Sequence, residues 1–69
     1  MANEVEDEIR EAGAFMMVDK FGYLWLPGDG LLDGDVRHDV AKLFRLGALD
    51  HDADHYYVKE QYRHLFERI

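Results

Sequence analysis

The stretch Ala14-Phe-Met-Met-Val-Asp-Lys-Phe-Gly-Tyr-Leu-Trp-Leu26 is the most conspicuous apolar part of this chain. It contains two runs of strand-forming residues, separated by Asp19-Lys20-Phe21-Gly22. An aspartate can open a type I turn, and a glycine can take the positive φ that closes a bulged hairpin loop. The sequence therefore predicts a β-hairpin over residues 14–26 that carries much of the hydrophobic core.

Apolar side chains occupy both faces of this predicted hairpin. On its second strand, Tyr23 and Trp25 alternate with Leu24 and Leu26. A sheet with two apolar faces is expected to be covered on both, so we predict helices over one face and partial cover over the other. Trp25 is then a core residue, and truncating it is expected to unfold the protein.

Three helices are predicted around the hairpin, over about residues 3–12, 34–46 and 59–68. Glycines at positions 13 and 47 are placed to end the first two. Apolar residues recur at helical spacing in each segment: Val5, Ile9 and Ala12; Val36, Val40 and Leu43; Tyr62, Leu65, Phe66 and Ile69.

One or two short strands are expected over about residues 48–58, around Asp52-Ala53-Asp54. The predicted order is helix, hairpin, helix, strand or strands, helix. With 69 residues there is room for one small domain, so we predict a single compact α+β domain over 1–69. Such a small core makes association plausible, and we expect a monomer or a weak homodimer.

Charge is the most informative part of the composition. Fifteen acidic residues oppose eight basic ones, which gives a net charge of −7. This balance argues against direct binding to nucleic acid, which needs a basic face. It favours attraction to basic surfaces. Because the acids are nine Asp and six Glu with only three Lys, an alternative is a small halophilic interaction or regulatory module.

The chain is a poor candidate for an enzyme. It contains no Ser, Thr or Cys, so the usual nucleophiles are missing, and no cofactor motif is present. No apolar run approaches the roughly 18 residues of a membrane span, and the first residues lack a signal-peptide pattern. We therefore expect a non-catalytic cytoplasmic protein that needs no cofactor and binds no membrane.

A weak metal-binding module at residues 50–55 is a second alternative. Asp50-His-Asp-Ala-Asp-His55 begins like an EF-hand loop, and imidazole with carboxylate suits several transition metals. The pattern then departs from the EF-hand, because His55 stands where the loop needs Gly and Gln61 where it needs a bidentate Glu. An acidic hairpin tip explains the segment better, and no metal ligands are assigned.

The segment from Leu43 to Val58 resembles the helix and wing of a winged-helix domain. In that family the helix enters the major groove and a basic wing contacts phosphate. Here the wing tip would be Asp50-His-Asp-Ala-Asp54, whose charges repel phosphate. The hairpin over 14–26 also interrupts the helix order of the family.

The acids form three blocks along the chain. Residues 1–11 sum to −4, residues 29–39 to −3 and residues 50–54 to −3. If the helices pack on the hairpin, these blocks can merge into one negative surface that attracts a nucleic-acid-binding protein. A solvated surface that serves only solubility is the competing interpretation. The residues predicted to contact a partner are Glu8, Glu11, Asp33, Asp35, Asp39, Asp50, Asp52 and Asp54.

In its size, its acidity and its lack of catalytic residues, the whole chain resembles the small anti-CRISPR proteins of phages and mobile elements. The resemblance implies a stoichiometric inhibitor that imitates DNA in the host cytoplasm. Its partner would be a basic nucleic-acid-binding protein or an RNA-guided surveillance complex. In a Cascade-type complex it would prevent recruitment of the target DNA.

Overall fold

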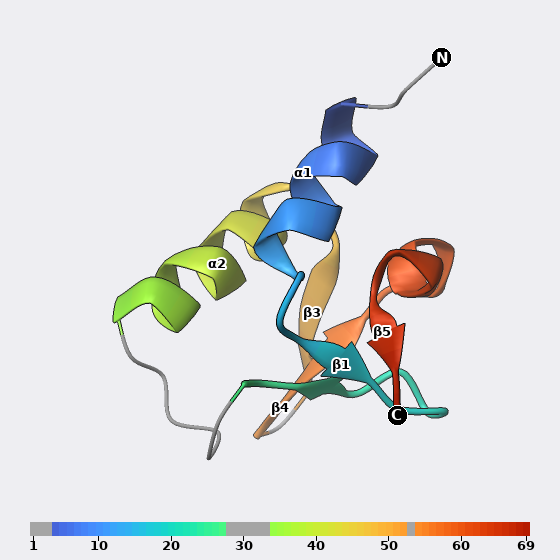
Figure 1. Cartoon of the computed structure of the whole chain (residues 1–69). Coiled ribbons are helices and arrows are strands. Elements are labelled where there is room, and N and C mark those ends of the chain that lie inside the picture. The colour runs from blue at the N-terminus through green and yellow to red at the C-terminus, as the bar shows by residue number, and fades with distance from the viewer. Residues whose placement is uncertain (1–3, 28–33, 53) are drawn as a thin grey trace.

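The computed structural model describes residues 4–27, 34–52 and 54–69. The chain has the predicted α+β class, and its Cα radius of gyration of 11.1 Å is that of a compact protein. Figure 1 shows the elements in chain order: α1 (Glu4–Ala12), β1 (Met17–Val18), β2 (Leu24–Trp25), α2 (Gly34–Arg45), β3 (Leu49–Asp52), β4 (His55–Val58), the 3-10 helix η1 (Glu60–Leu65) and β5 (Glu67–Arg68).

The strands form two small sheets. β1 lies in the middle of the first, antiparallel to β2 and parallel to β5. β3 and β4 form the second as an antiparallel pair, which confirms the two-strand interpretation of residues 48–58. A single bridge between Tyr23 and Tyr57 joins β2 to β4, so the two sheets continue into one another.

The β1–β2 turn forms at the predicted residues. The Gly22 N–H donates to the main-chain oxygen of Asp19 at 3.0 Å, and Gly22 has a φ of 95°. The Asp19 side chain adds an Asx turn, because its Oδ1 accepts from the N–H groups of Phe21 at 2.9 Å and Tyr23 at 3.0 Å. The hairpin is therefore confirmed, although each of its paired strands is only two residues long.

The two predicted helix ends are also confirmed. α1 ends at Ala12, and a Cβ atom on Gly13 would overlap the ring of Phe66. After α2, Gly47 has a φ of 79° and the Ala48 N–H donates to the carbonyl of Leu43 at 3.0 Å. This is the bond that closes a Schellman motif.

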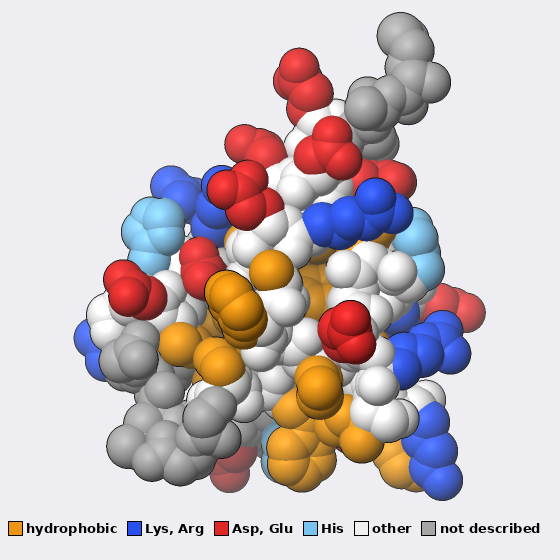
Figure 2. Space-filling view, viewed as in Figure 1, with side chains coloured by type: hydrophobic (Ala, Val, Ile, Leu, Met, Phe, Trp, Pro, Cys, Tyr) orange, Lys and Arg blue, Asp and Glu red, His pale blue; other side chains and the backbone are white. Residues whose placement is uncertain are grey.

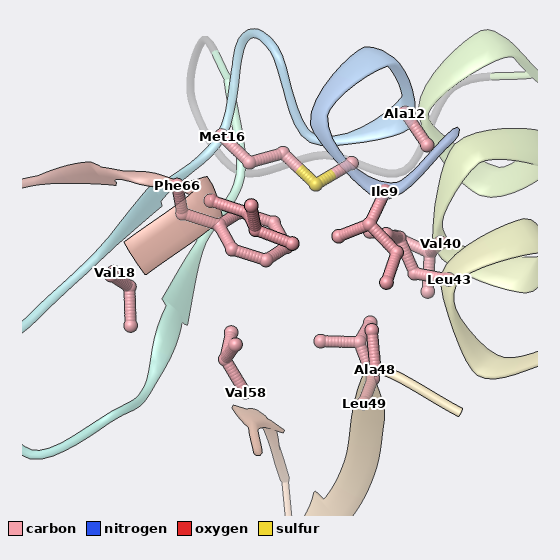
Figure 3. Packing of buried hydrophobic residues seen from close by; sticks show 11 residues of the cluster. Ile9, Ala12, Met16, Val18, Val40, Leu43, Ala48, Leu49, Val58 and Phe66 are labelled. Carbon is pink, nitrogen blue, oxygen red and sulfur yellow. The ribbon is translucent and has the colours of Figure 1, made fainter. Parts of the chain in front are cut away.

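The core lies between the helices and the inner faces of the sheets (Figure 3). Apolar residues from α1, α2, β1, β3, β4 and η1 meet there without a buried polar side chain among the described residues. The buried cluster consists of Ile9, Ala12, Met16, Val18, Val40, Leu43, Ala48, Leu49, Val58, Leu65 and Phe66.

The last element differs from the predicted helix over 59–68. η1 covers only 60–65 and is a 3-10 helix, after which Phe66 is extended with φ −112° and ψ 153°. Residues 67–68 then pair with β1, and the Ile69 N–H donates to the Val18 carbonyl at 3.1 Å. Pairing with the open edge of β1 replaces the last helical turn. Ile69, predicted on the buried stripe, is 69% exposed.

The hairpin contributes less to the core than predicted. Met16 and Val18 are buried, but Phe15, Phe21 and Trp25 are 84%, 63% and 57% exposed. Trp25 is therefore a surface residue and its assignment to the core is wrong, so we no longer expect its truncation to unfold the protein. The reason is that the buried cluster lies against only one face of the sheet.

None of the helices in the described ranges is long and apolar enough to cross a membrane.

Candidate functional site

Four of the predicted contact residues lie on the helices. Glu8 and Glu11 are exposed on α1, where Figure 2 shows acidic side chains gathered at the top of the molecule. On α2, Asp35 is exposed, and Asp39 is partly buried with its Oδ1 at 3.9 Å from Nδ1 of His38. The prediction for Asp33 falls outside the described residues.

The other three acids lie on the β3–β4 hairpin. Asp50 and Asp52 belong to β3, Asp54 to the turn, and all three are exposed. Asp50 is paired with Tyr57 and Asp52 with His55, so the two carboxylates lie on the same face of the hairpin. Residues 49–58 carry a charge of −3 and no Lys or Arg. The hairpin is therefore a local acidic surface.

The acidic blocks of α1 and of the β3–β4 hairpin do not merge into one surface. Figure 1 places α1 at one end of the molecule and the β3–β4 turn at the other. The block over residues 29–39 lies only partly within the described residues, and α2, which contains two of its acids, carries three basic residues and a charge of +1. The structure brings Asp50, Asp52 and Asp54 together and leaves Glu8 and Glu11 apart from them.

In the described part of residues 50–55, the two histidines of the alternative metal site do not converge. His51 pairs with Tyr56 and Asp52 with His55, so the strand alternation puts the two imidazoles on opposite faces of the hairpin. Ring contacts agree with this, since His51 lies against Tyr56 and His55 against Tyr23. Across the described ranges, no group of three or more His, Asp or Glu residues is arranged to hold a metal ion.

The feature that sequence reasoning missed is the outer face of the joined sheets. By the alternation of paired strands, Met17, Tyr23 and Trp25 share this face with Tyr57 and the acids of β3. Figure 2 shows hydrophobic side chains gathered over the three-stranded sheet. The sequence did contain an indication of this outer face. Tyr23 and Trp25, whose side chains each have a polar atom, alternate with the purely apolar Leu24 and Leu26.

Tyr23 joins the aromatic and acidic parts of this outer face. Its ring centroid lies 5.2 Å from that of His55 and 5.9 Å from that of Tyr57. Its hydroxyl donates to Oδ2 of Asp52 at 3.3 Å. The charge of Asp52 and this hydrogen bond raise the pKa of the Tyr23 phenol, so the hydroxyl stays protonated and remains a donor.

Asp19 holds the indole of Trp25 in place. The Nε1–H of Trp25 donates to Oδ2 of Asp19 at 3.1 Å, while Oδ1 accepts the two turn N–H groups. Partial desolvation raises the pKa of Asp19, but the hydrogen bonds from the indole and from the backbone of Tyr23 and Phe21 outweigh it and lower the pKa below its ordinary value. The carboxylate is therefore ionised at neutral pH.

An open pocket of about 240 Å³ lies between these side chains. Its lining combines an indole, a phenol, an imidazole and a carboxylate with one aliphatic side chain: Asp19, Tyr23, Leu24, Trp25 and His55.

Exposed aromatic side chains lie before β1 (Phe15), in the β1–β2 turn (Phe21) and on β2 (Trp25). With about 200 Å² for a whole aromatic side chain, the exposed fractions of Phe15, Phe21 and Trp25 leave roughly 400 Å² of aromatic surface uncovered. The largest apolar patch of a monomeric protein is typically about 300–600 Å² and is often functional. The three side chains together expose an area of that order.

Comparison with protein-family models, with curated proteins and with solved structures found no match to this chain. A functional assignment therefore depends on the surface described above.

Proposed function

We propose that this protein is a non-catalytic binding protein that docks onto a basic, nucleic-acid-binding protein and blocks it. Its contact surface is the outer face of the sheets together with the acidic β3–β4 hairpin. The observation that supports this most directly is the juxtaposition of Asp50 and Asp52 with the half-buried Tyr23 and the exposed Trp25 on one face.

This arrangement matches how protein interfaces are built. Buried aromatic residues, Trp and Tyr above all, contribute most of the affinity, while charges at the rim steer association and select the partner. Here the aromatic residues lie beside three carboxylates that no Lys or Arg of residues 49–58 neutralises. A partner with a basic rim around an apolar centre is complementary to this surface.

The specific partner that we propose is an RNA-guided surveillance complex of the Cascade type. Such a complex has a basic channel that receives DNA, and a chain with a net charge of −7 is attracted to it. Competition with target DNA would make the protein a stoichiometric inhibitor. The resemblance in size and charge to anti-CRISPR proteins supports this choice.

The test is capture of partners on the immobilised protein from a lysate of the cells that express it. We expect basic nucleic-acid-binding proteins that are released by salt and by double-stranded DNA. The purified partner should lose DNA binding in a mobility-shift assay when one equivalent of this protein is added. Replacing the hairpin acids (Asp50→Asn, Asp52→Asn, Asp54→Asn) should weaken binding about tenfold or more, which corresponds to about 1.4 kcal/mol.

The matched control removes three charges from α1 instead (Glu4→Gln, Glu8→Gln, Glu11→Gln). We expect a smaller loss, since α1 lies at the other end of the molecule. An equal or larger loss would place the contact on α1 and contradict the proposed surface. Captured proteins that are not basic, or binding that salt does not affect, would contradict the proposal itself.

Circular dichroism at low salt separates this function from salt adaptation. A protein whose acids serve a salt-rich cytoplasm unfolds when salt is removed, whereas a binding protein held by its apolar core stays folded. We expect the spectrum in about 10 mM buffer to match the spectrum at physiological ionic strength.

A further inference from the structure

We infer that the pocket between Trp25 and Tyr23 binds the guanidinium group of an arginine side chain. The inference deepens the proposed function, on which it rests for the claim that the arginine belongs to a basic protein partner. The chemistry of the pocket carries the assignment of the side chain itself.

The volume of the pocket favours a small ligand over a cofactor-sized one. Sites for cofactors and drug-sized molecules are about 300–1,000 Å³ and enclose most of the ligand. A pocket of about 240 Å³ that is open to solvent instead suits one extended side chain. A side chain of a docked protein can reach into such a pocket while the backbone of that protein stays outside.

The indole of Trp25 supplies a surface for stacking. Its Nε1–H is already bonded to Asp19, so the edge of the ring is occupied and its orientation is held. The side chain is more than half exposed. Trp is the best aromatic partner for a cation, and guanidinium, being planar and weakly hydrated, stacks on aromatic faces better than ammonium does.

Asp19 supplies the negative charge at the same place. Its Oδ1 accepts two backbone N–H groups and its Oδ2 accepts one indole N–H, which leaves acceptor capacity on Oδ2 for one more donor. A guanidinium N–H that reaches this oxygen makes a charge-assisted hydrogen bond. An anionic ligand, in contrast, meets a fixed carboxylate in the pocket wall.

No basic side chain of the described residues competes for this pocket. Lys20 is next to Asp19 in the chain, but its Nζ lies 5.1 Å from the centroid of the Phe21 ring. Arg63 donates from Nε to the Val58 carbonyl at 3.1 Å and from Nη2 to the Tyr57 hydroxyl. The residues that line the pocket include no Lys or Arg.

The experiment uses peptides and the one tryptophan of the chain as reporter. The probes are acetylated and amidated Gly-Gly-Xaa-Gly-Gly peptides in which Xaa is arginine, lysine or citrulline, the last being the uncharged analogue of arginine with nearly the same shape. Binding is followed by the NMR shift of the Trp25 indole N–H at pH 8. We expect the arginine peptide to bind with millimolar affinity and the citrulline peptide about tenfold more weakly or not at all.

Two matched variants locate the charge that matters. Asp19→Asn keeps the size of the side chain and one oxygen that can accept the hydrogen bonds of the turn. It should weaken binding of the arginine peptide about tenfold. Glu67→Gln removes the same charge from the same sheet face, two strands away from β2 and outside the pocket lining. This control should change the affinity less than twofold. Circular dichroism is used to check that both variants are folded.

Equal binding of the arginine and citrulline peptides, or equal losses in the two variants, would overturn the inference. Binding of the lysine peptide as tightly as the arginine peptide would overturn the choice of guanidinium. These measurements need no partner, so a negative result would contradict the arginine pocket without contradicting the proposed function. Capture of a basic partner that depends on Asp50, Asp52 and Asp54 but not on Asp19 would leave that function standing without the pocket.

Discussion

The two faces of the β1–β2 hairpin have similar hydrophobicity and opposite surroundings. On the inner face Met16 and Val18 are at most 2% exposed, while on the outer face Met17 and Trp25 are 45% and 57% exposed. The buried cluster that includes residues of α1, α2 and η1 lies against the inner face alone. Apolar character therefore does not distinguish a core face from an exposed face in this protein, and the cover supplied by other elements does.

Adjacent methionines provide the sharpest test of this difference. Met16→Ala empties a buried site and is expected to lower the free energy of unfolding by about 2–5 kcal/mol. Met17→Ala removes the same atoms from the outer face and should cost less than about 1 kcal/mol. Urea denaturation of both variants measures the two values. Similar losses would show that both faces are packed and would remove the case for an exposed binding surface.

The next largest effect is expected at the junction of α1 with the sheet. Gly13→Ala places a Cβ atom in the ring of Phe66, and relief of the overlap should cost about 1–3 kcal/mol of stability. Gly34→Ala is the control, since nothing lies within 4 Å of a Cβ atom there. Thermal unfolding of the two variants compares them. A neutral Gly13→Ala variant would mean that Phe66 can move and that the inner face is loosely packed.

A smaller change in stability is expected on the outer face, at Trp25. Trp25→Ala should lower the free energy of unfolding by about 1 kcal/mol or less, through loss of the bond to Asp19 and of partial packing. The same variant should lose binding of the proposed basic partner. Denaturation and binding measured on one preparation separate the two effects. If the variant were unfolded, Trp25 would have to be counted as a core residue after all.

Acidification should produce the smallest change, again on the outer face. Because the pKa of Asp19 is lower in the folded protein than in the unfolded chain, its contribution to stability is present above the unfolded pKa and is lost as the pH falls through the folded pKa. Fluorescence of Trp25 should show a transition below about pH 4, where Asp19 takes up its proton. Asp19→Asn should abolish that acid transition, and a transition near pH 6 in the wild type would point to a histidine instead.

Much of the fold could be predicted from local patterns. Asp19 and Gly22 mark the turn, Gly13 and Gly47 mark helix ends, and the spacing of Ile9 with Ala12 marks the buried side of α1. Each of these signals acts within a few residues of the chain, through backbone angles, local hydrogen bonds or helical periodicity. Such signals do not depend on how the elements pack in the tertiary structure.

The candidate site was predictable only in part. The acids of residues 50–54 were expected at a hairpin tip, and the structure places them there. The aromatic half of the site was assigned to the core, because a Trp in an apolar strand is more often buried than exposed. The pocket combines residues from β2, β4 and the β1–β2 turn, and no local pattern reveals that they meet.

The sequence by itself determined the net charge of −7, the α+β class, the hairpin turn and the ends of α1 and α2. Only the tertiary structure decided which face of that hairpin is covered, that residues 67–68 become a strand, and that the acids of α1 and of β3–β4 stay apart. The physical reason is that charge, turns and capping depend on neighbours in the chain. Burial depends on which elements pack together, and a stretch such as 14–26, with two apolar faces, does not specify that choice.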